Sequence, residues 1–193
     1  MIQKLGNIAN LQFGSYNKPQ KEGAVKYLHA SHFDSFYKPT KFKESYIELE
    51  AKHNKYLLKP NDVILAGKGH RTFAWAYQPE FGKAIPSSLF YIIRTKSSEI
   101  LGTYLAQFLN SEKIQYNLKL IGAGATITSI PKKELEQIDI FIPSIKEQQR
   151  IVNLIKLLDE DIKLTQKLLE KRTALKRGLI NKIITNQTEK VTL

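Results

Sequence analysis

Short apolar runs separated by turn residues occupy the chain as far as Pro143, and this pattern predicts a domain built around a sheet. The segment 25–29 alternates apolar and polar side chains as a half-buried strand does. The runs 62–66 and 88–94 are almost continuously apolar, which is typical of buried strands. A further strand is expected at 138–142, immediately before the proline.

Helical spacing replaces this pattern over 98–118. The apolar face of the expected helix is made of Ile100, Leu101, Tyr104, Leu105, Phe108 and Leu109. We expect Ser97 or Ser98 to cap this helix. A single helical turn opened by a proline is expected at 131–136. Residues 1–143 are therefore predicted to form an α+β (mixed α/β) domain with a sheet core.

From Ser144 onward the pattern is that of one long helix. Ser144 and Glu147 have the spacing of a capping box, and apolar residues then recur at alternating steps of four and three. These seam residues are Ile151, Ile155, Leu158, Ile162, Leu169, Leu179 and Ile183. About 40 residues at 1.5 Å each form a rod of roughly 60 Å, too long to pack wholly against a domain of about 145 residues. The seam therefore predicts a coiled coil with a partner helix, and a helix that folds back on its own domain is the alternative.

Polar residues interrupt this seam at Thr165, Arg172 and Lys176. A simple parallel zipper does not ordinarily place Arg and Lys at seam positions. Leu168 and Leu175, each one position earlier, take over the seam if the register shifts. We expect the dimerising coiled-coil helix to occupy 144–186 and a flexible tail to occupy 187–193.

The composition excludes several classes of protein. The chain has 193 residues, of which 42% are hydrophobic, so a core can form and intrinsic disorder is excluded. Because the sequence contains no cysteine, a disulfide scaffold, a thiolate zinc site and a cysteine nucleophile are excluded. No apolar run approaches the roughly 18 residues of a membrane span, and Met1–Gly6 carries no signal-peptide core. We therefore expect a soluble, cytoplasmic protein.

Positive charge is the strongest global feature of the sequence. Lys and Arg number 30 against 18 Asp and Glu, which gives a formal charge of +12. Residues 1–145 contribute +7 (19 against 12) and residues 146–193 contribute +5 (11 against 6), so neither part is a basic tail. This surplus is compatible with binding to nucleic acid, although many small proteins are basic for solubility alone.

Catalytic and metal-binding patterns are weak. His29 and His32 form a close pair, but on a strand their side chains would point to opposite faces, and no third ligand has a zinc-like spacing. Asp34 with Glu50 and Lys52 imitates a metal-dependent nuclease, without a strand pattern around them. We therefore expect no catalytic residue, no metal site and no cofactor in this chain. The alternative functions are a small metal-dependent endonuclease with a helical dimer arm and a structural coiled-coil adaptor with a basic head.

Glycine pairs occur in two places without completing a phosphate-binding motif. Gly67 and Gly69 follow a predicted strand, but the remaining glycine and the Lys-Ser/Thr pair of a phosphate-binding loop are missing. Gly122 and Gly124 follow a helix rather than a strand. We expect both pairs to be turns that need positive φ.

Cationic and aromatic residues are combined in three loops, as is typical of loops that contact DNA. In the loop 67–75, Arg71 has the chemistry to read guanine, while Lys68 suits a phosphate. The loops 13–21 and 36–43 carry the same residue types. The candidate DNA-binding residues are Tyr16, Lys18, Lys21, Lys38, Lys41, Lys43, Lys68, His70 and Arg71. For one loop alone, solvated charge is the simpler interpretation; the three together favour DNA.

An ordered series of motifs runs through most of the chain. The less specific segments are 5–14, 25–34 and 60–69. The most specific are Gly124-Ala-Thr-Ile-Thr-Ser-Ile-Pro131, the junction Ile142-Pro-Ser-Ile-Lys-Glu-Gln-Gln-Arg-Ile151 and the distal Leu175-Lys-Arg-Gly-Leu-Ile-Asn-Lys-Ile183. With these motifs the chain resembles half of a type I restriction–modification DNA specificity subunit: one target recognition domain (1–143) followed by one conserved helical region.

The resemblance implies a non-catalytic DNA reader that recruits other subunits. Methyltransferase (modification) subunits would bring AdoMet, and a restriction/translocase subunit would bring ATP and Mg²⁺, so these cofactors belong to the partners. The usual subunit has two recognition domains whose long helices pair antiparallel, whereas this chain has one of each. We therefore expect a homodimer, or pairing with another half-subunit, that reads a bipartite inverted-repeat site in double-stranded DNA.

Overall fold

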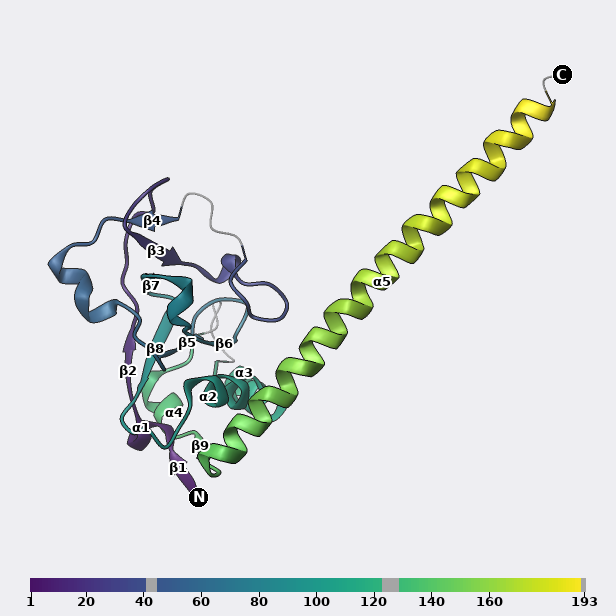
Figure 1. The fold of residues 1–193 in the computed structure, drawn as a ribbon. Coiled ribbons are helices and arrows are strands. Elements are labelled where there is room, and N and C mark those ends of the chain that lie inside the picture. The colour runs from purple at the N-terminus through teal and green to yellow at the C-terminus, as the bar shows by residue number, and fades with distance from the viewer. Residues whose placement is uncertain (41–44, 123–128, 192–193) are drawn as a thin grey trace. The chain divides into compact units, whose positions relative to one another are not determined.

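The computed structural model describes residues 1–40, 45–122 and 129–191. The chain divides into two compact units, Met1–Val152 and Asn153–Leu193 (Figure 1). The first unit is a mixed domain of strands and helices, and the second is the greater part of one long helix. Within the described residues, no helix combines the length and the apolar character that crossing a bilayer requires.

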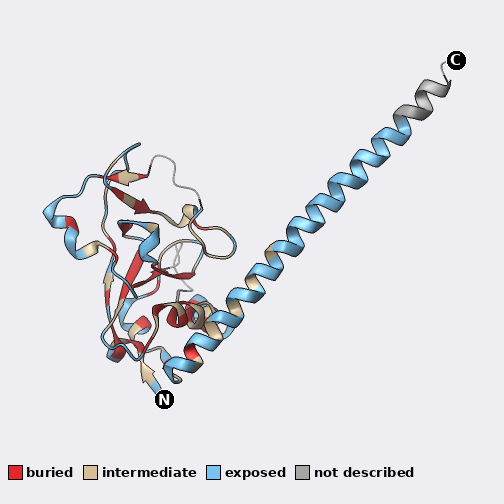
Figure 2. Ribbon diagram, viewed as in Figure 1, coloured by how far each residue is buried: buried red, intermediate tan, exposed pale blue. Residues whose placement is uncertain are grey.

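The core of the first unit is a four-stranded antiparallel sheet in the order β2-β8-β5-β6. Its strands are β2 (Ala9–Phe13), β8 (Phe90–Thr95), β5 (Val63–Ala66) and β6 (Ala74–Ala76). Val63 and Leu65 belong to one apolar cluster, whereas Ile64 and Ala66 belong to another. Both faces of β5 are therefore buried (Figure 2), which explains why its sequence is continuously apolar. The strands predicted at 62–66 and 88–94 are confirmed.

Smaller sheets complete the β structure of this unit. In one, β3 (Val25–Leu28) pairs antiparallel with β4 (Tyr46–Ile47) and parallel with β7 (Ala84–Pro86). In the other, β1 (Ile2–Lys4) pairs antiparallel with β9 (Asp139–Phe141). The second pairing ties the beginning of the chain to the residues that precede the long helix. The strands predicted at 25–29 and 138–142 are confirmed with slightly shorter bounds.

Short helices and 3₁₀ turns form the rest of the described domain. They are α1 (Leu5–Ile8), α2 (Gly102–Asn110), α3 (Glu112–Gly122), α4 (Lys132–Glu136), η1 (Ala30–His32), η2 (Ala51–Tyr56) and η3 (Pro79–Phe81). The single turn predicted at 131–136 is α4, with Pro131 at its N-cap. The prediction of one helix over 98–118 was wrong, because the backbone leaves the helical region at Ser111, where ψ is 146°.

The start of α2 is capped by residues from distant parts of the chain. The Gly102 amide donates to the Asn61 side-chain oxygen, and the Leu101 amide donates to Gln148 Oε1 at 2.9 Å. Ser97 Oγ instead accepts the amide of Glu99, so the expected serine cap was wrong. Gln148 is fully buried, and the first turn of the long helix is thereby fixed to α2.

The long helix α5 spans Ile145–Val191. Ser144 Oγ accepts the Glu147 amide at 3.3 Å, which supplies one half of the predicted capping box. Among the seam residues, Ile151 packs against the core of the first unit. Ile155 is half-buried, and the described seam residues after it are exposed.

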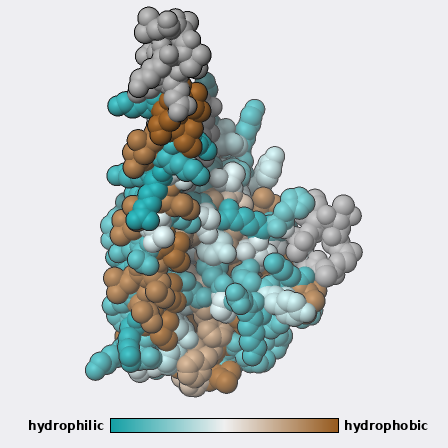
Figure 3. Space-filling view, turned by 90° about the vertical axis from the view of Figure 1, so that its right-hand side faces the viewer, coloured by the Kyte–Doolittle hydropathy of each residue, from teal (hydrophilic) through white to brown (hydrophobic). Residues whose placement is uncertain are grey.

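The second unit carries its apolar side chains on the outside. Leu158 is 54% exposed, Ile162 46% and Leu169 65%. Leu179 and Ile183 continue the row, and Figure 3 shows hydrophobic side chains recurring along the helix. The long C-terminal helix is thus confirmed, whereas its pairing as a coiled coil stays a prediction.

A buried ion pair holds the turn between η2 and β5. Arg94 donates from Nε to Asp62 Oδ1 (2.9 Å) and from Nη2 to Asp62 Oδ2 (2.7 Å). The Asp62 side chain is only 1% exposed, and Oδ2 also accepts the Lys59 amide at 2.8 Å. This turn places Asn61, with φ of 70°, where its side chain caps α2. The Asp62 carboxylate therefore connects the turn at Lys59 to Arg94 of β8. The neighbouring residue, Asn61, connects the same turn to the start of α2.

Candidate nucleic-acid interface

The loop 67–73 joins β5 to β6 and begins at a glycine that lies against an aromatic ring. A Cβ added to Gly67 would stand 2.6 Å from two ring carbons of Tyr91. Gly67 is therefore required for close packing, and the expectation of positive φ there was wrong. Gly69 does have positive φ, at 108°. Of the other predicted pair, Gly122 ends α3 and Gly124 lies outside the described residues.

Lys68 connects this loop to the beginning of the loop 13–21. Its Nζ lies 4.4 Å from the centroid of the Phe13 ring, within cation–π distance. Phe13 in turn stacks on Tyr91 with ring centroids 4.2 Å apart. The Tyr91 hydroxyl donates to the Ile130 carbonyl at 2.7 Å. The Tyr91 ring is therefore fixed at its hydroxyl by this hydrogen bond and at its backbone by β8. The cation is therefore presented on a fixed aromatic support.

Arg71 connects the same loop to the loop after η1. Its Nη1 donates to the Phe33 carbonyl at 3.0 Å, and its Nη2 donates to the Asp34 carbonyl. The guanidinium carbon also lies 5.1 Å from the Phe73 ring centroid and 5.6 Å from that of Tyr37. The loop 67–73 thus contacts both of the other predicted DNA-binding loops.

The loop that receives Arg71 is closed by its own hydrogen bonds. Asp34 Oδ1 accepts the amides of Phe36 and Lys38, both at 2.8 Å. Lys38 is half-buried, and its carbonyl accepts the Asp34 amide at 3.0 Å. Lys41 and Lys43, also predicted to bind DNA, lie outside the described residues. Asp34, which sequence reasoning considered as a metal ligand, organises this turn instead.

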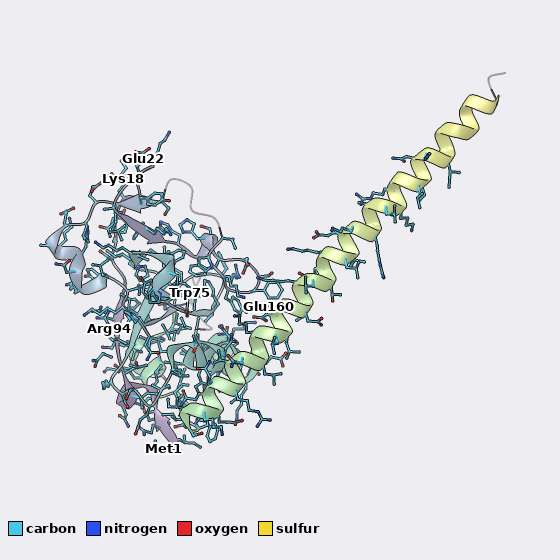
Figure 4. The ribbon with its side chains drawn as sticks, viewed as in Figure 1. Met1, Lys18, Glu22, Trp75, Arg94 and Glu160 are labelled. Atoms are coloured by element: carbon cyan, nitrogen blue, oxygen red, sulfur yellow. The ribbon has the colours of Figure 1, made fainter. Side chains whose placement is uncertain are left out.

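Tyr16, Lys18 and Lys21 lie on the loop 13–21 and are exposed, Tyr16 by 86%. The Tyr27 hydroxyl accepts the Asn17 amide at 3.0 Å and donates to the Ser15 carbonyl at 2.8 Å, which anchors the middle of this loop to β3. Figure 4 shows Lys18 at the end of the first unit that carries β3 and β4, away from Met1. Among the residues that the structure describes, no reported contact joins Tyr16 or Lys18 to the side chains of Lys68 and Arg71. The last candidate, His70, is an exposed residue of the loop 67–73.

The histidine pair differs from its predicted geometry. Because Ala30–His32 is a 3₁₀ turn rather than a strand, the two rings lie together, with centroids 5.4 Å apart, and the expectation of opposite faces was wrong. His32 Nδ1 accepts the His29 amide at 3.1 Å. Burial, and then the neighbouring His29, lowers the pKa of His32 to about 4. Within the described residues, no group of three or more His, Asp or Glu side chains is arranged to hold a metal ion.

We expect His32 to make stability depend on pH in the acid range. Between its ordinary pKa of 6.5 and the folded pKa of about 4, the unfolded chain binds a proton that the folded chain does not. The free energy of unfolding should therefore fall as the pH is lowered from 6.5 to about 4. Below about pH 4 the His32 ring is protonated in both states and causes no further fall. His32→Gln keeps a hydrogen-bond acceptor and should show a smaller fall. Urea midpoints at pH 7 and pH 4.5 measure this difference, and equal falls in both proteins would contradict it.

Comparisons with known proteins agree on one family. The model of the type I restriction modification DNA specificity domain matches residues 2–172. A curated protein, the putative type I restriction enzyme MjaX specificity subunit of Methanocaldococcus jannaschii, is 31% identical over 74 residues. That match covers 38% of this chain and 17% of the relative.

Solved structures share the fold at low sequence identity. The S subunit of a type I system from M. genitalium is 15% identical with a TM-score of 0.61, over 88% of this chain and 41% of that chain. The HsdS subunit from Thermoanaerobacter tengcongensis is 15% identical with a TM-score of 0.52, over 84% and 38%. A chain from a structure on complex assembly and conformational transition of the type I R-M system is 16% identical with a TM-score of 0.55, over 92% and 43%. This chain therefore spans about two fifths of each solved chain, and the likeness confirms the predicted mixed fold.

Proposed function

The chain belongs to the family of type I restriction modification DNA specificity domains, and from this premise we propose that it reads a specific sequence in double-stranded DNA without performing catalysis itself. The observation that carries the proposal is the meeting of two basic loops with a third that carries one lysine: the loop 67–73 contacts the basic loop 13–21 through Lys68 and the loop 30–39, which contains Lys38, through Arg71. A DNA duplex that approaches this junction meets cations on aromatic supports. Such side chains suit phosphates and base edges.

The proposal keeps the full set of predicted DNA-binding residues, with different roles. Lys38, Lys68, His70 and Arg71 belong to the junction of the loops 30–39 and 67–73. Tyr16, Lys18 and Lys21 belong to the exposed part of the loop 13–21, where they would extend the contact along the duplex. Lys41 and Lys43 follow the loop 30–39 directly in sequence.

Replacing Lys68 by Ala tests this surface. A lysine that binds phosphate contributes to all sequences alike, so the dissociation constant should rise by a similar factor for every duplex. The slope of log K against log salt should flatten by about 1. Lys83→Ala, which removes the same charge at an exposed position just before β7, serves as the control and should leave binding unchanged. Fluorescence anisotropy at several salt concentrations measures both quantities; equal behaviour of the two variants would place the DNA elsewhere.

A second copy of the chain is the proposed partner of α5. The apolar residues of the seam between Leu158 and Ile183 are exposed to solvent, so burying them against a second helix would be favourable. The distribution of charge along α5 determines whether the two helices pair parallel or antiparallel. Asp159, Glu160 and Asp161 form an acidic turn, whereas the following stretch is basic, with Lys171, Arg172, Lys176 and Arg177. A parallel pair would set the acidic turn against itself. An antiparallel pair centred near Lys167 sets it against the basic stretch and places Leu158 opposite Lys176.

The twofold symmetry of such a pair sets the form of the target and the partners. Two identical recognition domains would read an inverted repeat in two parts, because the symmetry of the protein is mirrored in the site. Methyltransferase (modification) subunits and a restriction/translocase subunit would then supply the chemistry, with AdoMet, ATP and Mg²⁺ bound to them. Pairing with a different half-subunit in place of a second copy would give an asymmetric target.

The local roles of the acidic residues support a non-catalytic reader over the alternative endonuclease. The side chain of Asp34 accepts two amides of its own loop. Glu50 pairs with Lys52 at 2.8 Å on the surface. These residues stabilise turns and pair locally, so the carboxylates and lysine that imitated a nuclease have structural partners.

A further inference from the structure

Arg71, a residue of the proposed DNA-binding surface, is held by contacts inside the protein. Both terminal nitrogens of its guanidinium donate to backbone carbonyls, Nη1 to Phe33 and Nη2 to Asp34. These two nitrogens are the pair that arginine presents end-on to the acceptors of guanine. Each of these two nitrogens therefore directs an N–H to the loop 30–39, and a bidentate contact to guanine through both of them would compete with this connection.

An aromatic stack supports the same connection. The rings of Tyr37 and Phe73 are parallel to within 3°, with centroids 5.4 Å apart, and the Arg71 guanidinium lies near both. Phe73 is fully buried and contacts Phe33 with centroids 5.0 Å apart, so the stack is rooted in the core. Tyr37 has φ of 57°, a left-handed conformation that a tyrosine adopts only when its surroundings hold it there.

We propose that Arg71 is a positioning residue, which fixes the loop 30–39 to the loop 67–73 and so sets the register in which the side chains on both loops meet DNA. The proposal rests on the DNA-reading function proposed above and deepens it. Arg71 then determines specificity through Lys38 and His70, whose loops it joins, rather than through a base of its own. Loss of this connection between the two loops would weaken sequence preference at several base pairs at once.

Lysine is the decisive replacement. Arg71→Lys keeps the positive charge but cannot donate to two diverging carbonyls as a planar fork does. Arg71→Ala removes the charge as well, and Lys83→Ala removes one charge elsewhere as the control. Each full-length variant is examined by hydrogen exchange of the segment 33–40 in the free protein and by selection from a pool of randomised duplexes at low salt.

With Arg71→Lys we expect the amides of Tyr37 and Lys38 to exchange roughly ten-fold faster, the size of one charge-assisted hydrogen bond. Sequence preference should weaken at more than one base pair, while affinity for unrelated DNA stays within about two-fold. Unchanged exchange with preference lost at a single base pair would show a direct reader and overturn the proposal. Faster exchange with intact preference would show a purely structural residue and also overturn it. A wild-type chain that selects no sequence would refute the DNA-reading function itself, while the exchange measurement would still report whether Arg71 holds the loop.

Discussion

Leu158→Lys should convert the proposed dimer to a monomer at micromolar concentration. In the proposed antiparallel pair Leu158 lies opposite Lys176, so the substitution removes a buried leucine and opposes two cations. Burial of one leucine is worth about 2 kcal/mol, and the twofold axis repeats the change. The dissociation constant should therefore rise about a thousand-fold, before the repulsion is counted.

A glutamate at the same position tests the direction of the helices. In the antiparallel pair Leu158→Glu faces Lys176 and regains part of the loss as an ion pair, so it should weaken dimerisation less than lysine does. In a parallel pair each substituted side chain would face its own copy, and the two variants would be equally harmful. Ile162 lies opposite Arg172 in the proposed register. Ile162→Lys should therefore weaken dimerisation more than Ile162→Glu does.

Ala174→Lys is the matched control for this experiment. It adds the same charge about 160° round the helix from Leu158, on the face away from the seam. Light scattering at several concentrations gives the mass of each variant, and circular dichroism shows whether the helix is retained. A wild-type chain that is monomeric at micromolar concentration, or a dimer untouched by Leu158→Lys, would refute pairing through this seam.

The strands and the long helix were predictable because their signals are local. The run of β5 is apolar at every position because Val63 and Leu65 enter one cluster while Ile64 and Ala66 enter the other. The long helix has no proline from Ile145 onward, and its apolar residues recur at helical spacing on both sides of the polar interruption at 165–176, so nothing nearby competes with the helix. A pattern of burial that repeats within a few residues is visible in the sequence itself.

The errors arose where distant residues decide the local structure. The start of α2 is set by Asn61 and Gln148, which stand about 40 and 47 residues away, and no pattern within the segment 98–118 contains that information. Ser111 interrupts the same segment although apolar spacing continues past it. Local propensity is a weak guide when tertiary hydrogen bonds satisfy the helix end.

The candidate interface was predictable in its residue types but not in their contacts. Sequence alone identified Arg71 as a cation beside glycines and aromatics. The carbonyls that its guanidinium meets belong to Phe33 and Asp34, and backbone acceptors have no sequence signature. The aromatic supports Phe13 and Tyr37 were missed as site residues, although each stands beside the predicted cations in the sequence.

Asp62→Ala should destabilise the domain more than the loss of the exposed Lys4–Asp139 ion pair. Its carboxylate is 1% exposed and accepts two nitrogens of Arg94 together with the Lys59 amide. Removal leaves the Lys59 amide without its acceptor and leaves the partly buried Arg94 guanidinium with only the Leu57 carbonyl, at 3.1 Å from Nη2, which costs about 3 to 5 kcal/mol. The turn that places Asn61 loosens as well, so the cap of α2 weakens with it.

The control is an ion pair whose N–O distance is similar to that of Arg94 and Asp62 but whose side chains are more exposed to solvent. Lys4 and Asp139 also approach to 2.8 Å, but their side chains are 41% and 63% exposed. Asp139→Ala should therefore change the free energy of unfolding by at most about 1 kcal/mol. Thermal unfolding should show Asp62→Ala melting about 10 °C lower, since each kcal/mol corresponds to about 2 to 4 °C in a chain of this size. If the two variants melted together, water would be replacing the carboxylate at Arg94, which is itself 30% exposed, and burial of Asp62 would not be what stabilises the turn.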